Sequence, residues 1–260
     1  MSKFDQTIKT LKIFFADSNS IAESSAKVIQ EVTLAINLNS KPLANIACAG
    51  INLDELTIGF LRSERIIAES DEIAKIEITA RENRVNVILK NKKKIFETFV
   101  KNIASSGARS KGSYAESLLP LSVPEDLKIN VPVALNLMDK LLNNSTLHNK
   151  TGGTHCSALA IGKNIIALRE DIGRHNTIDM LGGYALLQNI NLSEAKILTT
   201  GRISSEIVYK VWNMGIPVII SHSAPTANAV ELSHKANITL IAYVRGGRMS
   251  IYSHERRVKI

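Results

Sequence analysis

Cysteine and aromatic residues are scarce in this chain, and each scarcity excludes a class of protein. Two cysteines, Cys48 and Cys156, stand far apart among 260 residues, and neither belongs to a Cys-x-x-Cys pair. This usage argues against a disulfide framework and a structural zinc site, and it favours a reducing, cytoplasmic location. Aromatic residues make up only 5% of the chain, and no RRM, KH or zinc-finger pattern occurs. We therefore expect no nucleic-acid partner, although the net charge is +8.

Long apolar runs and several catalytic signatures are also missing. No apolar run approaches the ~20 residues that cross a bilayer, and the first residues lack the apolar core of a signal peptide. The sequence thus predicts a soluble protein without a membrane partner. It contains no GxSxG nucleophile elbow, Walker loop, GxGxxG fingerprint or zinc-deaminase pair of HxE and PCxxC. These absences favour a site that holds a ligand over one that hydrolyses it, and they predict no metal ligands.

The patterning divides the chain into four segments. Residues 1–22 are polar and weakly patterned, which predicts a loose N-terminal arm. Residues 23–100 predict a smaller, strand-rich α+β domain with strands over 28–38, 43–49, 73–79, 85–89 and 95–99 and a short helix over 54–61. Residues 101–128 lack an apolar period and predict a mobile loop and linker.

The last segment, residues 129–260, alternates helical and strand patterns. Helices are expected to begin near 131, 177, 204 and 226 and to end near 142, 188, 214 and 235; strands are expected over 155–168, 196–200, 218–221 and 238–244. Such alternation is typical of a layered α/β/α domain, so the chain as a whole is predicted to be α/β.

The most informative stretch runs from Arg169 to Asn176 and carries five ionisable side chains. It follows a short apolar segment that predicts a buried strand, and it precedes an amphipathic helical pattern for which Asn176 is the expected N-cap. Ligands of open α/β sheets bind at such strand-to-helix loops, and helix N-termini favour anions. Asp171, Arg174 and His175 are therefore candidate binding residues. Alternatively, the octet only caps a helix and pairs its own charges.

Four further polar loops border predicted strands: three place glycine beside arginine, histidine or hydroxyl side chains, and the fourth carries hydroxyl side chains without glycine. Arginine presents a fork suited to phosphate, and glycine lets a ligand approach the backbone. Each loop has a plainer alternative: a glycine turn, a Ser/Thr helix cap or an ordinary hairpin turn. The candidate residues are Gly152, Gly153 and His155; Gly201, Arg202 and Ser204; Ser221, Ser223 and Thr226; and Arg245, Gly246, Gly247 and Arg248.

Five stretches of the sequence match a known family. They read EVTLAINLNSKPLANIACAG, NLDELTIGFLRSERII, TGGTHCSAL, REDIGRHNTIDMLGG and TTGRISSEIVYKVWNMGIPVIISHSAPTANAVELSHKANITLIAYVRGGRMSIY. On these motifs, which span about residues 25–254, the chain resembles the formate dehydrogenase accessory (FdhD) sulfur-carrier proteins. The resemblance implies a three-layer, cytidine-deaminase-like α/β/α fold for residues 129–260, without zinc, and a homodimer.

The resemblance also implies a function. Such proteins take persulfide sulfur from a cysteine desulfurase and pass it to the molybdenum or tungsten bis-pterin guanine dinucleotide cofactor, which activates the catalytic subunit of formate dehydrogenase. The segment that the family associates with this cofactor matches Tyr243, Val244, Arg245, Gly246, Gly247 and Arg248. A guanine nucleotide, as one part of the cofactor, suits the anion-binding loops described above.

One departure concerns the sulfur-carrying cysteines. In the family they lie in a loop that aligns with Ser105–Gly112, and this chain has no cysteine there. Cys156 is the candidate that remains near the site, because His155 or a nearby arginine could favour its thiolate. Alternatively, Cys156 is a small core residue, as Cys48 is expected to be. Three functions stay open: a sulfurtransferase using Cys156, a cofactor-binding chaperone without sulfur transfer, and a metal-independent nucleotide-processing enzyme.

Overall fold

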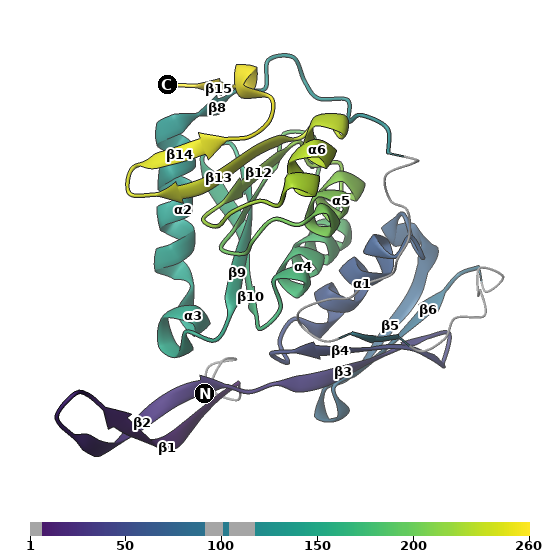
Figure 1. The fold of residues 1–260 in the computed structure, drawn as a ribbon. Helices are drawn as coiled ribbons and strands as arrows, with labels where there is room; N and C mark the ends of the chain where they lie inside the picture. The colour runs from purple at the N-terminus through teal and green to yellow at the C-terminus, as the bar shows by residue number, and fades with distance from the viewer. Residues whose placement is uncertain (1–6, 92–100, 104–117) are drawn as a thin grey trace.

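Three parts of the chain can be distinguished in the computed structural model, which describes residues 7–91, 101–103 and 118–260. Figure 1 shows a smaller unit beside a larger unit that contains a central sheet, and a two-stranded arm that extends away from both. No helix within the described ranges is both long enough and apolar enough to cross a membrane.

The smaller unit is a five-stranded sheet with one helix. The strand order is β5-β6-β3-β4-β7, formed by β3 (Val32–Leu38), β4 (Lys41–Cys48), β5 (Ile73–Thr79), β6 (Arg84–Leu89) and β7 (Lys101–Ile103). Alternate apolar residues of β3 share one buried core with α1 (Leu53–Ser63). Asn39 and Ser40 have φ angles of 49° and 65°, as the primed turn of a two-residue β-hairpin requires. Short 3₁₀ turns occupy Ser70–Glu72 and Ala80–Glu82.

The larger unit is built on a six-stranded sheet with the order β10-β9-β11-β12-β13-β14. The strands are β9 (His155–Ile161), β10 (Asn164–Asp171), β11 (Lys196–Thr199), β12 (Val218–Ser221), β13 (Thr239–Arg245) and β14 (Arg248–Ile251). β11, β12 and β13 are parallel, whereas β9 runs antiparallel to β11. The end of β11 and the start of β9 therefore lie at the same edge of the sheet.

Helices cover both faces of this sheet (Figure 1). On β11, Ile197 belongs to the core shared with α4 (Arg174–Leu187), α5 (Ser205–Asn213) and α6 (Ala227–Lys235). The next residue, Leu198, belongs to the core shared with α2 (Val131–Asn144), as the alternation of side chains along a strand requires. The remaining elements are α3 (Thr146–Thr151), a small pair of β8 (Ile129–Asn130) with β15 (Val258–Lys259), and a 3₁₀ turn at Glu255–Arg257.

Helix α4 joins the two units, and the expectation that it is amphipathic is wrong. One side of α4 packs on the large sheet, and the other side crosses α1 in direct contact, so most of its residues are buried. At the crossing, a Cβ on Gly59 would lie 1.7 Å from the backbone oxygen of Asp179. The Asp179 side chain pairs with Lys210 of α5 and accepts a hydrogen bond of 2.7 Å from the Ser63 hydroxyl. Because both faces of α4 are covered, its sequence has no polar stripe.

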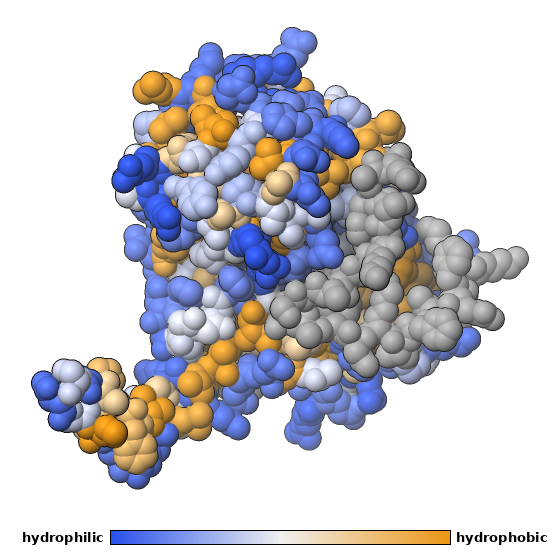
Figure 2. Space-filling view, in the orientation of Figure 1, coloured by the Kyte–Doolittle hydropathy of each residue, from blue (hydrophilic) through white to orange (hydrophobic). Residues whose placement is uncertain are grey.

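The predicted loose arm over residues 1–22 is also corrected. Residues 8–29 form a hairpin of β1 (Ile8–Ala16) and β2 (Ile21–Ile29). Several of its apolar side chains are exposed, among them Phe14 at 66% and Ile21 at 75%, whereas Ile8 and Ile29 at its base are partly buried. Figure 2 shows apolar surface on the arm. The strand expected over 28–38 is accordingly two strands, divided after Ile29. Backbone pairing between the two strands, more than burial of side chains, stabilises the hairpin. The apolar pattern of the sequence therefore does not predict it.

Residues 104–117 of the predicted linker, and the strand expected over 95–99, lie outside the described residues. Residues 101–103 form β7 of the smaller unit. The segment from residue 118 is attached to the larger unit: the Leu121 amide donates to the Ala236 carbonyl at 3.0 Å, and Leu118 and Leu121 pack on the core of α5 and α6. The division of the chain into domains remains a prediction.

Candidate functional site

The loops predicted to bind a ligand converge at one edge of the large sheet. They follow the C-terminal ends of β11, β12 and β13 and precede the start of β9. Backbone hydrogen bonds link neighbouring loops: His222 N to Thr199 O at 3.0 Å, Ile203 N to Ala224 O at 3.0 Å, and Tyr243 N to Ser223 O at 3.2 Å. The edge is thus a connected surface that can hold a ligand across several loops.

Arg174 and Arg202 form the cationic centre of this edge. Arg174 is the first residue of α4, which begins three residues earlier than predicted, and a Cβ on Gly201 would lie 2.8 Å from its Cβ. Only glycine at position 201 therefore lets the backbone before Arg202 pass so close to the Arg174 side chain. The pKa of Arg174 is lowered by burial and, second, by the positive charge of Arg202.

Two polar atoms of this edge are buried without a hydrogen-bond partner in the described part of the chain. They are Nε of Arg174 and the hydroxyl of Ser204. Ser204 occupies the N-cap position of α5, as predicted, but its side chain makes no cap hydrogen bond. A buried donor without a partner costs about 1–3 kcal/mol. An anion bound between Arg174 and the start of α5 would supply acceptors for both groups.

His155 is half-buried in the same region. Burial lowers its pKa, and the charges of Arg174 and His148 lower it further. The neutral ring is therefore favoured in the absence of an anion. Gly152 and Gly153, which precede it, are exposed, and Gly152 has a φ of 65° at the C-terminal end of α3. A bound anion would favour protonation of His155 and would add a third cationic group.

The first two charges of the polar octet have structural roles. Arg169 forms a two-pronged ion pair with Glu55 of α1, one bond of which measures 2.6 Å, and its guanidinium lies 4.9 Å from the ring centre of Tyr184. The carboxylate of Glu170 accepts the amides of Leu147 (3.1 Å) and His148 (2.8 Å), and it thereby caps α3. These two residues are therefore structural, as the plainer alternative expects, but their partners lie outside the octet, in α1 and α3.

Asp171 is also a structural residue, which corrects its prediction as a ligand contact. Its carboxylate is fully buried and accepts hydrogen bonds from the Ala49 amide (2.8 Å), the Gly173 amide (3.0 Å) and the Asn176 side chain (2.7 Å). The helix begins after Gly173, so Asn176 is not its N-cap as predicted. The Asn176 amide instead donates to Asp171 and to the Ala47 carbonyl.

Three further predicted residues lie behind the surface of the edge. His175 is 1% exposed, with Nε2 at 3.6 Å from a carboxylate oxygen of Glu206. The Ser221 hydroxyl donates to the Gly201 carbonyl at 2.9 Å and holds that loop in place. Thr226 caps α6 by accepting the Ala229 amide at 3.3 Å, which is the plainer alternative for that residue.

The β13–β14 hairpin carries the exposed arginines. Arg245 and Arg248 pair across a turn of Gly246 and Gly247, whose φ angles are 58° and 71°, and no atom would oppose a Cβ at either glycine. The Arg245 guanidinium lies 5.3 Å from the ring centre of Tyr243. Val244, between them, is 1% exposed and packs into the core. Because side chains alternate along a strand, the Val244 side chain cannot contact a ligand. The Ser223 carbonyl, which accepts the Tyr243 amide, links this hairpin to the neighbouring loop.

The cysteines are both fully buried. Burial raises the pKa of Cys156 to about 12, and its thiol lies 3.6 Å from a carboxylate oxygen of Glu170. Burial likewise raises the pKa of Cys48 to about 12. Neither environment favours the thiolate that a nucleophilic cysteine requires. The alignment position of the family cysteines, Ser105–Gly112, lies outside the described residues.

Residues that sequence reasoning missed support this edge from behind. Nδ1 of His148 lies 2.6 Å from the Thr154 carbonyl, and the Thr200 hydroxyl accepts the Cys156 amide at 3.0 Å. Glu206 lies beside His175 and opposes the lowering of the Arg174 pKa. No local sequence signal marks these residues, because their roles depend on strands and helices that meet only in the fold.

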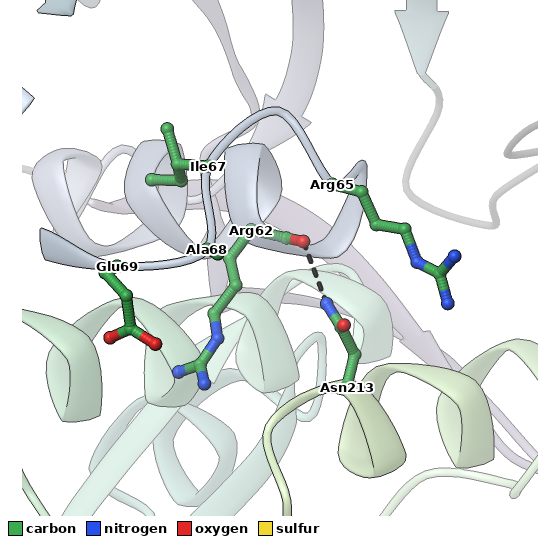
Figure 3. A pocket seen from close by; sticks show the side chains of 6 residues that line it. All are labelled: Arg62, Arg65, Ile67, Ala68, Glu69 and Asn213. Carbon is green, nitrogen blue, oxygen red and sulfur yellow. Dashed lines mark hydrogen bonds between the residues drawn. The ribbon is translucent and has the colours of Figure 1, made fainter. Parts of the chain in front are cut away.

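A separate cavity of about 350 Å³ lies between the end of α1 and the end of α5 (Figure 3). Arg62 and Arg65 line it, and the Asn213 side chain donates to the Arg62 carbonyl at 2.9 Å. Arg65 lies over the rings of Tyr209 and Trp212. Helix C-termini carry partial negative charge, which these arginines offset. We therefore assign this cavity to the packing of the two units. The ligand site is assigned instead to the edge at the start of α5.

Among the residues that the structure covers, no cluster of three or more His, Cys, Asp or Glu is arranged to hold a metal ion.

Comparison with known proteins identifies the family. The model of the FdhD/NarQ family matches residues 29–259. Sulfur carrier protein FdhD of Staphylococcus haemolyticus (strain JCSC1435) is 35% identical over 247 residues, which cover 94% of this chain and 94% of that protein. Sulfur carrier protein FdhD of Staphylococcus aureus (strain JH9) is 34% identical over 246 residues, or 93% of each chain.

The fold is shared with a solved structure. The crystal structure of a protein provisionally described as a formate dehydrogenase accessory protein, from Desulfotalea psychrophila, has a TM-score of 0.80 at 22% sequence identity. The alignment covers 97% of this chain and 100% of that one. With the family match over most of its length, the chain belongs to the FdhD/NarQ family.

Proposed function

We propose that this protein is an accessory factor for formate dehydrogenase and that its arginine-rich edge binds the guanine-dinucleotide part of the dehydrogenase's molybdenum or tungsten bis-pterin cofactor. The observation that carries the proposal is the adjacency of Arg174 and Arg202, with the buried Nε of Arg174 and hydroxyl of Ser204 left without partners within the described ranges. The names of the relatives support the choice of client. The cofactor is cargo here: it is delivered to the dehydrogenase, and its metal serves redox chemistry there.

The edge offers matching groups for the diphosphate and for the base of a nucleotide. A diphosphate would lie between Arg174, Arg202 and the start of α5, where the paired guanidiniums supply forked donors. His155 would add a donor on protonation. The exposed ring of Tyr243 with Arg245 above it gives a flat surface for a guanine base. These residues hold and orient the cargo and need no nucleophile.

Sulfur transfer is the second candidate function, and the printed name of the relatives favours it. A cysteine desulfurase would donate the sulfur, and Cys156 would receive it. In the described conformation the raised pKa and complete burial of Cys156 oppose that step, so Cys156 would first have to become exposed. Cofactor binding requires no such change and is therefore the better-supported function.

Several expectations from the resemblance belong to the same proposal. They are the cytidine-deaminase-like arrangement of the larger unit, a homodimer, and a cytoplasmic location in which the dehydrogenase and the desulfurase are partners. The absence of nucleic acid among the partners also remains a proposal.

Titration with guanosine diphosphate tests the cofactor site. We expect Arg174→Gln and Arg202→Gln each to weaken binding by about tenfold, because each removes charge-assisted hydrogen bonds worth about 1.5–3 kcal/mol. Arg81→Gln is the matched control, since Arg81 is exposed on a turn of the smaller unit. Unchanged affinity in both edge variants would exclude this site.

Intact-mass spectrometry after incubation with a cysteine desulfurase and cysteine tests sulfur transfer. A gain of one sulfur that disappears in Cys156→Ser but persists in Cys48→Ser would make Cys156 a sulfur carrier. No gain in the unmodified protein would leave cofactor binding as the function.

A further inference from the structure

A second pocket lies at the opposite edge of the large sheet from the candidate site. Its volume is about 300 Å³, and it is bounded by the start of α2, the turn between β9 and β10, and the first residue of β11. β11 runs from Lys196 to Thr199, so its two ends are about 10 Å apart along the strand. The arginine-rich edge follows Thr199, and the second pocket begins at Lys196. The two sites are therefore separate.

The floor of this pocket is apolar. Ile129, Ala134 and Leu137 line it, and each is only 1% exposed. Val133, half-buried, completes the apolar side. Ala134 and Leu137 lie on α2, and Ile129 lies on β8 just before it. Because this floor is already covered, the apolar surface open to a ligand is that of Val133 and of the methylene chains of the lysines at the rim.

The rim of the pocket carries three lysines: Lys128, Lys163 and Lys196. Lys128 and Lys163 are exposed, whereas Lys196 is only 6% exposed. Within the described part of the chain, no carboxylate lies at ion-pair distance from any of these ammonium groups. Nζ of Lys196 has a carbonyl contact with Gly162 at 3.4 Å, which is long for a charged hydrogen bond.

The burial of Lys196 without a counter-charge is the unusual feature. Removing an ammonium from water costs several kcal/mol, and proteins normally offset this cost with a paired anion. Burial lowers the pKa of Lys196, and the exposed Glu194 only partly opposes that effect. An apolar side chain of the same length would fill the position without the cost. An anionic ligand would explain why a lysine stands there.

We propose that this pocket binds a small organic carboxylate with a short apolar body. The carboxylate lies among the ammonium groups of Lys128, Lys163 and Lys196, and the apolar body lies against Val133, above the floor that Ile129, Ala134 and Leu137 close. The ligand is a compact amphiphile, because the pocket is at the small end of the range for organic ligands. An inorganic anion would leave the half-buried Val133 side chain in contact with water.

Calorimetric titration of the whole protein with hexanoate, benzoate and inorganic phosphate tests the proposal. Hexanoate and benzoate are expected to bind saturably, and phosphate at least about tenfold more weakly, because it buries no apolar surface. Lys196→Met should weaken hexanoate binding by about tenfold. Lys140→Met is the matched control, because Lys140 is exposed on the same helix and lies outside the pocket, and its affinity should equal that of the unmodified protein.

A second variant tests the pocket without a change at the buried Lys196. Lys163→Glu reverses one charge on the exposed turn, where folding is unaffected, and it should weaken hexanoate binding by roughly fivefold. Three results would overturn the proposal: no saturable binding of either carboxylate, equal binding of hexanoate and phosphate, or unchanged hexanoate affinity in Lys163→Glu. Because removal of an unpaired buried charge is expected to raise thermal stability, Lys196→Met should melt at a higher temperature while it loses the ligand.

Discussion

Replacement of Gly183 by alanine should disrupt the crossing of α1 and α4. A Cβ at this position would lie 1.9 Å from the backbone oxygen of Glu55 and 2.9 Å from the Gly59 amide nitrogen. Both atoms are backbone, so neither can turn away as a side chain could, and the two helices must separate. Overpacking costs about 1–3 kcal/mol and occasionally more; a backbone obstacle places this case at or above the upper end.

The net effect includes a gain in helix propensity. Alanine is about 1 kcal/mol more favourable than glycine inside a helix, so the expected net loss for Gly183→Ala is about 2 kcal/mol. For a protein of this size, each kcal/mol shifts the melting temperature by about 2–4 °C. We therefore expect the melting temperature to fall by about 4–8 °C, measured by circular dichroism at 222 nm.

The neighbouring glycine supplies the control. A Cβ on Gly182 would meet the flexible end of Met214, with Cε at 2.5 Å, and that methyl group can move. Gly182→Ala has the same propensity gain without the backbone clash, so its melting temperature should stay within about 3 °C of the unmodified protein. Equal shifts in the two variants would refute the reasoning, because they would show that the crossing can widen at no cost.

Four further predictions concern other parts of the fold. Lys210→Met leaves the carboxylate that Lys210 neutralises buried in the α4–α5 contact, and it should cost about 3–5 kcal/mol by urea denaturation; a loss below 1 kcal/mol would contradict the ion pair. In the absence of ligand, Thr226→Ala removes a cap bond and should cost about 1 kcal/mol, whereas Ser204→Ala removes none and should be nearly neutral; the reverse order would contradict the cap assignments. Because folding raises the pKa of Cys48 and Cys156 from 9.0 to about 12, the protonated thiols favour the folded state, and stability should fall as pH rises from about 9 towards 12. Iodoacetamide at pH 7.5 should modify both cysteines in urea and neither in the folded protein, by intact mass; rapid modification without urea would contradict their burial.

The sequence predicts the helices and strands after residue 129 well, because their signals are local. The predicted helix over 204–214 is found as Ser205–Asn213, with Ser204 at its start and Gly215, at a φ of 77°, just beyond its end. The strand expected over 196–200 is found as Lys196–Thr199. Turn residues and an apolar run define each of these elements, whatever packs against them.

Elements whose environment is set by distant residues were predicted less well. The pattern of α4 was interpreted as amphipathic because nothing in residues 174–187 reveals that α1 will cover the second face. The contact depends on Gly59, more than a hundred residues earlier in the chain. The sequence does not predict the hairpin of residues 8–29 for the opposite reason: Leu11, Phe14, Phe15 and Ile21 remain exposed, so the segment has no core pattern.

The polar octet illustrates why a dense cluster of charge does not by itself define a binding site. Arg169 ties the loop to α1, Glu170 caps α3, and Asp171 holds the amide of Ala49 after β4. Each of these three side chains binds a different element, so the octet is a junction of three elements before it is a site. The same bonds fix the backbone from which Arg174 projects. Binding at Arg174 should therefore depend on Asp171 through position rather than contact, and a substitution at Asp171 should lower stability and anion affinity together, whereas Arg202→Gln should lower affinity alone.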